Sequence, residues 1–220
     1  MAGGAAPRVA SAAMPTREYT VDQMLPAEQS GVVGALGRAF YNDPLFNFFV
    51  PDPVTQTKAL LAFMGAAVVD AKPFDEIWVA HTDGKIACAA VWLPPGTYPR
   101  GVRRDALVNL RGVPTFVRAG RRLSGAVRLL GALDKAHHEL AEPHYYLAIL
   151  GTDPLFQRTG AGSAALQPVL DRCDADGLTA YLETQKEENL AYYARHAFEL
   201  TRVVELNGVP PVWTMTRKPR

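Results

Sequence analysis

The sequence predicts an α/β fold in which a mixed central sheet is flanked by helices. Short apolar runs typical of strands alternate with longer stretches whose apolar residues recur at helical spacing. Asp83-Gly84 lies between two strand-like runs and indicates a tight hairpin. The C-terminal half then alternates strand, helix, strand, helix and a closing strand pair. This order predicts helices packed on a sheet that contains both parallel and antiparallel pairs.

Local patterns predict each element of the N-terminal half. The alternation at 17–25 predicts a first strand, and apolar residues at helical spacing predict a helix at 27–43, before Pro44. A second helix is predicted at 52–71, and the hairpin strands at 76–95. These elements give the order strand, two helices and hairpin.

The segment 103–140 is predicted to be helical, with breaks near 112–114 and between Gly120 and Gly125. Arginines are frequent in the chain from Arg100 to Arg128. The pattern favours a solvated helix face, and an anion-binding patch is the alternative.

The elements of the C-terminal half are closely spaced. A continuous apolar run predicts a strand that is buried on both faces. In order, we predict a strand at 144–154, a turn and helix at 153–173, a strand at 178–184, a short helix at 189–198, and strands at 200–206 and 212–218.

The composition limits the class of protein. A chain of 220 residues with 48% apolar residues predicts one domain at 17–220, after a disordered tail at 1–16. The net charge of +1 gives no strong field toward nucleic acid or anionic membranes, and no apolar run approaches a membrane span. Cys88 and Cys173 have no metal-ligand spacing and are expected to be reduced core thiols, which fits a cytoplasmic protein. The oligomeric state is open between monomer and homodimer.

The turn from Gln157 to Gly162, with the sequence QRTGAG, stands between a strand and a helix. The first amides of a helix have no intrahelical acceptor, and the helix dipole adds positive charge there. Glycine allows positive φ and close approach, so residues Arg158–Ser163 are predicted to cradle a pyrophosphate. The alternative is a helix start that uses glycine only for close packing. The spacing differs from the P-loop and from the dinucleotide fingerprint.

This turn resembles motif A of the GCN5-related N-acetyltransferases (GNAT), and the element order is similar to that fold. Asn189, Tyr193 and Phe198 resemble a later motif of the same family. The last third, with Leu182–Thr184 and Trp213–Pro219, is most similar to puromycin N-acetyltransferases. The resemblance departs from the family at Ala197, where the usual residue is glycine.

The resemblance implies a sheet whose splayed strands hold acetyl-coenzyme A as co-substrate, with no metal. In this family the pantetheine arm lies between the strand before motif A and the next strand, while the pyrophosphate sits on the turn. Asn189 is expected to cap its helix as well as contact the arm. The cofactor-binding residues that the resemblance implies are Ile149, Leu150, Thr152, Gln157, Arg158, Thr159, Gly160, Ala161, Gly162, Ser163 and Asn189.

The reaction that the resemblance implies is attack of an uncharged amine on a thioester, which needs a base for the amine and an acid for the thiolate. Tyr193 matches the family tyrosine that protonates the thiolate, whereas Tyr192 diverges by about 100° on a helix. Glu183 is the candidate base, and it has an alternative role in substrate binding. Other candidates for the base are His137, His138, His144, Tyr145 and Tyr146.

The expected function is N-acetylation of a primary amine of a small molecule, such as an aminonucleoside like puromycin or another antibiotic-like amine. The aromatic segment Phe40–Phe49 is a candidate wall of the acceptor pocket, with packing on the core as the alternative. Two other functions stay open: acetylation of a protein lysine or N-terminus, and a non-catalytic coenzyme A sensor.

Overall fold

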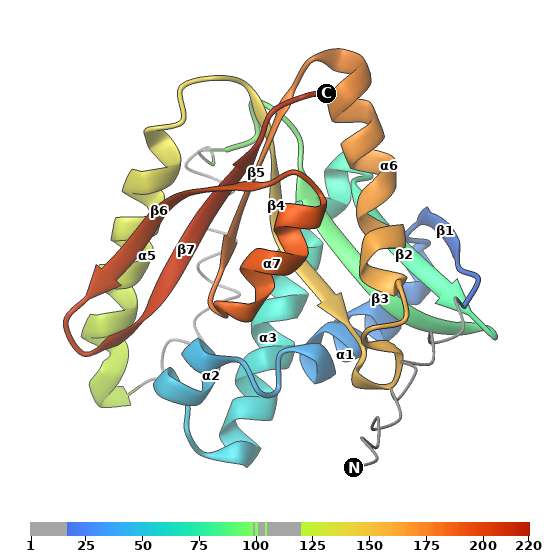
Figure 1. Ribbon diagram of the computed structural model, residues 1–220. Coiled ribbons are helices and arrows are strands. Elements are labelled where there is room, and N and C mark those ends of the chain that lie inside the picture. The colour runs from blue at the N-terminus through green and yellow to red at the C-terminus, as the bar shows by residue number, and fades with distance from the viewer. Residues whose placement is uncertain (1–16, 99, 101–103, 105–119) are drawn as a thin grey trace, which may run out of the picture.

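The computed structural model in Figure 1 describes residues 17–98, 100, 104 and 120–220. The predicted tail and most of the predicted arginine-rich helical segment lie outside these residues. The strands are β1 (Thr20–Gln23), β2 (Ile77–Thr82), β3 (Lys85–Leu93), β4 (His144–Thr152), β5 (Thr179–Thr184), β6 (Glu199–Leu206) and β7 (Val209–Arg217). The helices are α1 (Gln29–Ala39), α2 (Pro44–Phe49), α3 (Pro53–Ala71), α5 (Leu123–His138), α6 (Ala161–Asp176) and α7 (Glu188–Arg195), with 3-10 turns at Pro26–Glu28, Lys72–Phe74, Gly120–Arg122 and Pro154–Phe156.

The described strands form a sheet in the order β1-β2-β3-β4-β5-β7-β6. The pair β4–β5 is parallel, and the other neighbours are antiparallel. The sheet is therefore mixed and flanked by helices, which confirms the predicted fold class.

Strands β4 and β5 pair over only part of their length. The pairing runs from His144 opposite Thr179 to Leu147 opposite Leu182, and no later residue of β4 is paired with β5. The register between β3 and β4 also shifts at this point, because Ala148 is an extra residue between the paired Leu147 and Ile149. The bulge bends β4 where its pairing with β5 ends. The predicted splay between these strands is thus present.

Two hydrophobic cores cover opposite faces of the sheet, because alternate side chains of β3 enter different clusters. One core packs α6 and the end of α7 against the sheet, and the other packs α1 and α3 (Figure 1). A smaller cluster packs α5 against β6 and β7. None of the helices in the described ranges has both the length and the apolar character that a membrane crossing requires.

Local chemistry explains most element boundaries. The predicted hairpin is present, and Asp83 and Gly84 both have positive φ, at 51° and 67°. The short helix α2 was not predicted as a separate element, although Asp43 caps it by accepting the amides of Leu45 and Phe46. The two cysteines are free and buried, as expected.

Candidate active site

The turn between β4 and α6 is held by the chain's own contacts. The buried carboxylate of Asp153 accepts hydrogen bonds from the Leu155 amide and from Arg38 Nε of α1, the latter at 2.7 Å. The Thr159 hydroxyl donates to the Phe156 carbonyl, since a carbonyl only accepts. The turn is therefore fixed by Arg38 of α1 and by hydrogen bonds within its own segment.

Two residues of this turn have left-handed backbone conformations. Gly160 has φ 97° and Arg158 has φ 63°. For a residue with a side chain this conformation costs about 1–2 kcal/mol, which is typical of strained functional turns. Gly160 is the N-cap of α6, and no side chain of the described residues caps that helix start. Its first amides are therefore available to an anion.

Gly162 and Tyr192 meet at the same place. A Cβ on Gly162 would lie 2.7 Å from the Tyr192 hydroxyl and 3.3 Å from Thr152 Oγ1. That hydroxyl is buried, and no hydrogen bond of good geometry reaches it from the residues described. Ser163 lies near enough to oppose part of the rise that burial causes in its pKa. Glycine is thus required at position 162 because the Tyr192 hydroxyl approaches it closely. At position 160 glycine is required because φ is positive. An orphaned buried hydroxyl costs about 1–3 kcal/mol, which a ligand atom in the turn would offset.

The side chains predicted to line the cofactor arm face different ways. Ile149 is 5% exposed and belongs to the core under α1 and α3, whereas Leu150 packs against the opposite core. The Thr152 hydroxyl contacts Cys88 Sγ at 3.2 Å. The feature they share is the free edge of β4, so any common contact with a ligand is through the backbone.

Helix α7 places the motif residues with one correction. The expectation that Asn189 caps the helix is wrong, because the N-cap residue is Glu187 and Asn189 lies within the first turn. Its Nδ2 donates instead to Thr184 Oγ1 at 2.9 Å, which ties α7 to the end of β5. Tyr193 is 7% exposed and packs edge-on against Phe198. At the end of the helix His196 Nε2 lies 2.9 Å from Ser163 Oγ in α6.

Glu183 lies at the point where β4 and β5 separate. Its neighbour Leu182 forms the last β4–β5 pair, and the carboxylate accepts from Tyr181 Oη at 3.0 Å and from Tyr146 Oη at 3.3 Å. Burial raises the pKa of Glu183 from its ordinary 4.5 to about 7, and the two hydrogen bonds oppose part of that rise. Sequence reasoning missed Tyr181, although residues two apart on a strand share a face.

Histidines and tyrosines from distant elements surround this carboxylate. The ring of His137 packs on Tyr146 and Tyr181 at centroid distances of 4.6 and 4.5 Å, and it stacks on Tyr98 at 4.0 Å. Burial lowers the pKa of His137 from 6.5 to about 3. The cluster borders a pocket of about 320 Å³ between the end of β3 and the start of β4.

The hydrogen bonds of His144 fix the tautomers of the histidine pair. His144 Nδ1 lies 2.7 Å from the Glu142 carbonyl, so the proton of neutral His144 is on Nδ1. His144 Nε2 then accepts from His137 Nε2 at 2.7 Å. His137 is consequently a neutral donor.

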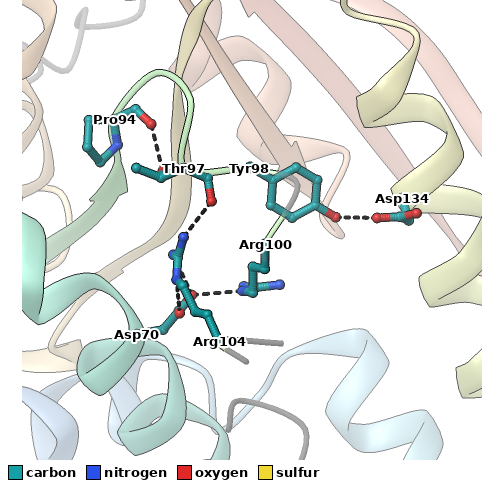
Figure 2. A network of polar contacts seen from close by, with 7 residues as sticks. All are labelled: Asp70, Pro94, Thr97, Tyr98, Arg100, Arg104 and Asp134. Atoms are coloured by element: carbon teal, nitrogen blue, oxygen red, sulfur yellow. Dashed lines mark hydrogen bonds and ion pairs between the residues drawn. The ribbon is translucent and has the colours of Figure 1, made fainter. Parts of the chain in front are cut away.

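The chain after β3 connects α3 to α5 across this cluster. Figure 2 shows Arg100 and Arg104 converging on Asp70 of α3, while the Tyr98 hydroxyl donates to Asp134 of α5 at 2.6 Å. The described residues include only part of the predicted arginine-rich segment: these two arginines and the stretch from Gly120 onward.

The aromatic segment Phe40–Phe49 packs mainly on the protein itself. Phe46 contacts Phe63 of α3 edge-on at 5.3 Å, and Phe49 joins the cluster of α5 with β6 and β7. Packing was one of the two predicted roles for this segment, and the contacts account for these rings.

The comparisons with known proteins agree with this arrangement. A protein from Corynebacterium glutamicum described as "histone acetyltransferase HPA2 and related acetyltransferase" is 24% identical, with TM-score 0.65, over 92% of this chain and 97% of that one. The polyamine N-acetyltransferase of Drosophila melanogaster is 17% identical, with TM-score 0.60, over 91% and 100%. Arylalkylamine N-acetyltransferase 2 from Aedes aegypti is 13% identical, with TM-score 0.58, over 93% and 100%. These likenesses show a shared fold.

The family model described as acetyltransferase (GNAT) family matches residues 38–198. That range contains the splayed strands, the turn before α6, Glu183 and α7. Because the match spans most of the 220 residues and the fold agrees with it, the chain belongs to the GNAT family of acetyltransferases.

Proposed function

We propose that this acyltransferase moves the acetyl group of acetyl-coenzyme A directly to a primary amine of a small molecule. The observation that carries the proposal is Glu183, a carboxylate with pKa near 7 at the point where β4 and β5 separate. An amine must lose a proton to attack a thioester, and a base with pKa near the working pH suits that transfer. Small amines are also the substrates named for the similar polyamine and arylalkylamine enzymes.

The residues present fit coenzyme A, which family members use as co-substrate. The uncapped first turn of α6 offers amides to a pyrophosphate, and the orphaned Tyr192 hydroxyl offers a further donor beside Gly162. Bound there, acetyl-coenzyme A supplies the acetyl group as a thioester. We assign its contacts to the backbone of Ile149, Leu150 and Thr152, to Gln157–Ser163 and to Asn189, and we add Tyr192.

Glu183 is favoured as the base over His137, Tyr145 and Tyr146. His137 has a pKa of about 3 and is therefore too weak a base at neutral pH. Burial raises the pKa values of Tyr145 and Tyr146 above their ordinary range, so both hydroxyls keep their protons. Tyr146 instead donates to Glu183, which stabilises the charged form.

Tyr193 is the proposed acid at the leaving thiolate. Burial raises the pKa of its hydroxyl well above the ordinary 10, so the hydroxyl is protonated throughout the physiological range. A protonated donor close to the sulfur stabilises the negative charge that develops as the carbon–sulfur bond breaks. The support for this role is the spacing of the α7 motif, which Tyr193 matches.

The test is thiol release from acetyl-coenzyme A with a panel of amines: puromycin, an aminoglycoside, polyamines, arylalkylamines, amino acids and a lysine peptide. Puromycin is included because the last third of the sequence resembles puromycin N-acetyltransferases. We expect turnover with at least one small amine, strongly reduced in Glu183→Gln at neutral pH. Mass spectrometry of the product should show one added acetyl group.

Two results would contradict the proposal. Turnover with the lysine peptide alone would indicate a protein acetyltransferase. Calorimetric binding of coenzyme A without turnover of any amine or peptide would indicate a sensor.

A further inference from the structure

Two arginines share one buried carboxylate, but they use it differently. The Asp70 side chain is 2% exposed. Arg104 binds it through Nε at 2.5 Å and through Nη2 at 2.9 Å, and its Nη1 donates to the Thr97 carbonyl. All three nitrogens of Arg104 are thus engaged in holding the chain after β3 to α3.

Arg100 has donors to spare. Only its Nε binds Asp70, at 2.9 Å, and its two terminal nitrogens have no partner among the residues described. Figure 2 shows that end of the side chain pointing away from Asp70, toward the side on which α5 lies. Asp70 neutralises one of the two guanidinium charges, and the next carboxylate, Asp134, is engaged by the Tyr98 hydroxyl. The Arg100 side chain is 23% exposed.

This free guanidinium belongs to the surroundings of Glu183. It lies 5.5 Å from the ring centroid of Tyr98, which contacts the ring of Tyr146, whose hydroxyl bonds Glu183. The cofactor turn is far away, because Tyr146 and Thr152 are six residues apart on β4, or about 20 Å. The ligand of Arg100 is therefore not the pyrophosphate of the cofactor.

We propose that Arg100 binds a carboxylate of the acceptor, so that the preferred substrates are amines that carry a carboxylate distant from the amine. This inference rests on the proposed function, because it names the acceptor class of the same site. A planar guanidinium with free terminal N–H groups matches a carboxylate with two hydrogen bonds. Glu183 then receives the amine end, and the rings of Tyr98 and Tyr146 line the path between the two charges.

The first experiment compares matched amines. The pairs are 4-(aminomethyl)benzoate with benzylamine, and 6-aminohexanoate with hexylamine; puromycin is a further amine without a carboxylate. We expect the acid of each pair to have a kcat/KM roughly tenfold to a hundredfold higher, the range for hydrogen bonds to a charged group. In Arg100→Gln this ratio should fall toward one. A wild-type preference for benzylamine and hexylamine, which lack the carboxylate, or for puromycin would overturn the inference.

Arg104→Gln is the matched control. It removes a guanidinium from the same carboxylate and from the same stretch of chain, but its donors are already used by the protein. It should lower the Tm and retain the preference for the acids. Arg100→Lys keeps the charge and should retain part of the preference, and it replaces Arg100→Gln if that variant does not fold. Equal loss of preference in the Arg100 and Arg104 variants would contradict a specific role for Arg100.

A binding measurement separates this inference from the proposed function. 3-Phenylpropanoate has the carboxylate but no amine, so its binding is measured by NMR without turnover. Wild-type binding that is weakened in Arg100→Gln supports the carboxylate site, even if no amine is acetylated and the proposed function fails. Absence of binding to the wild type, or equal binding to both proteins, overturns the inference.

Discussion

The two ends of the site are built in different ways. At the proposed cofactor end, most of the groups come from one contiguous segment, Asp153–Ser163, and their main feature is backbone conformation. At the acceptor end, the groups are side chains from α3, α5, β4, β5 and the chain after β3. Under the proposed function, the first arrangement would recognise an invariant phosphate group through amides, and the second could change its acceptor through single side chains.

The difference also concerns charge. The proposed cofactor end offers uncapped amides and an exposed Arg158, so we expect its binding to depend little on pH. The acceptor end contains a half-buried carboxylate whose pKa is near 7. Changes at the acceptor end should therefore alter pH profiles and substrate choice, whereas changes at the cofactor end should alter affinity for coenzyme A.

The largest effect is expected for Glu183→Gln, which keeps the shape and removes the base. Turnover should fall by roughly 10²–10⁴-fold. In the wild type, kcat/KM should rise as pH increases through about 7, because Glu183 must lose its proton to act. The variant should lack this rise in kcat/KM near pH 7. Part of its activity should return at high pH, where more of the amine is already neutral. A uniform loss with an unchanged pH profile would make Glu183 a substrate-binding residue.

The same variant should alter stability with a defined sign. The folded-state pKa of Glu183, about 7, exceeds its ordinary 4.5, so the folded protein binds more protons between these pH values. Wild-type stability therefore declines as pH rises through that window. Glu183→Gln should be the more stable protein above pH 7, by roughly 3 kcal/mol at most, and no more stable below pH 4.5. Urea unfolding at pH 4.5 and 8 measures this difference.

The predictability of the site follows the same division. Gly160 and Gly162 could be assigned from the sequence because a turn and helix start are local, although only the structure separates the φ requirement from the close approach. Tyr98 and Arg100 could not be assigned to the site, because their contacts with α5 and α3 span more than 25 residues of sequence. The strands could be predicted from their apolar runs, whereas the short helix α2, which Asp43 caps, was not predicted.

The adjacent tyrosines Tyr192 and Tyr193 on α7 provide the next test, because we propose different roles for them. Tyr193 is the proposed acid, and Tyr192 is a proposed cofactor contact. Tyr193→Phe should lower turnover at saturating acetyl-coenzyme A by about 10²-fold, the low end for a lost acid, with little change in cofactor affinity. Tyr192→Phe should instead raise the Kd for coenzyme A by roughly tenfold, because its orphaned hydroxyl faces the turn. Calorimetry and saturated turnover separate the two. A larger loss of turnover in Tyr192→Phe would exchange the assignments.

Gly160→Asp tests whether the cofactor end is an anion site. A Cβ at Gly160 meets no atom within 4 Å, and aspartate is a good N-cap that tolerates positive φ, so the variant should fold. Its carboxylate would repel a pyrophosphate and raise the Kd for coenzyme A by roughly tenfold or more. Gly160→Ala has the same backbone cost without the charge, so the difference between the two variants isolates electrostatics. Equal affinities would contradict an anion site at this turn.

The smallest effect is expected at Ala197, where the family glycine is missing. The amides of Phe198 and Ala197 bond the carbonyls of Tyr193 and Ala194, and Ala197 has φ 66°, which together define a Schellman motif. Alanine in this conformation costs about 1–2 kcal/mol of stability. Glycine avoids that cost but lowers stability by about 0.5–1 kcal/mol, because it loses more conformational entropy on folding. Ala197→Gly should therefore stabilise the protein by roughly 0.5–1 kcal/mol.

The control for this variant is Ala191→Gly on the exposed face of α7, which should destabilise the protein by about 1 kcal/mol. The two variants delete the same methyl group, so opposite signs in urea unfolding would show that backbone conformation is the cause. If Ala197→Gly also leaves the Kd for coenzyme A unchanged, the strain at Ala197 is not needed for cofactor binding. A weaker Kd in that variant would mean that the turn before Phe198 positions α7, and the cofactor end would then depend on more than its own segment.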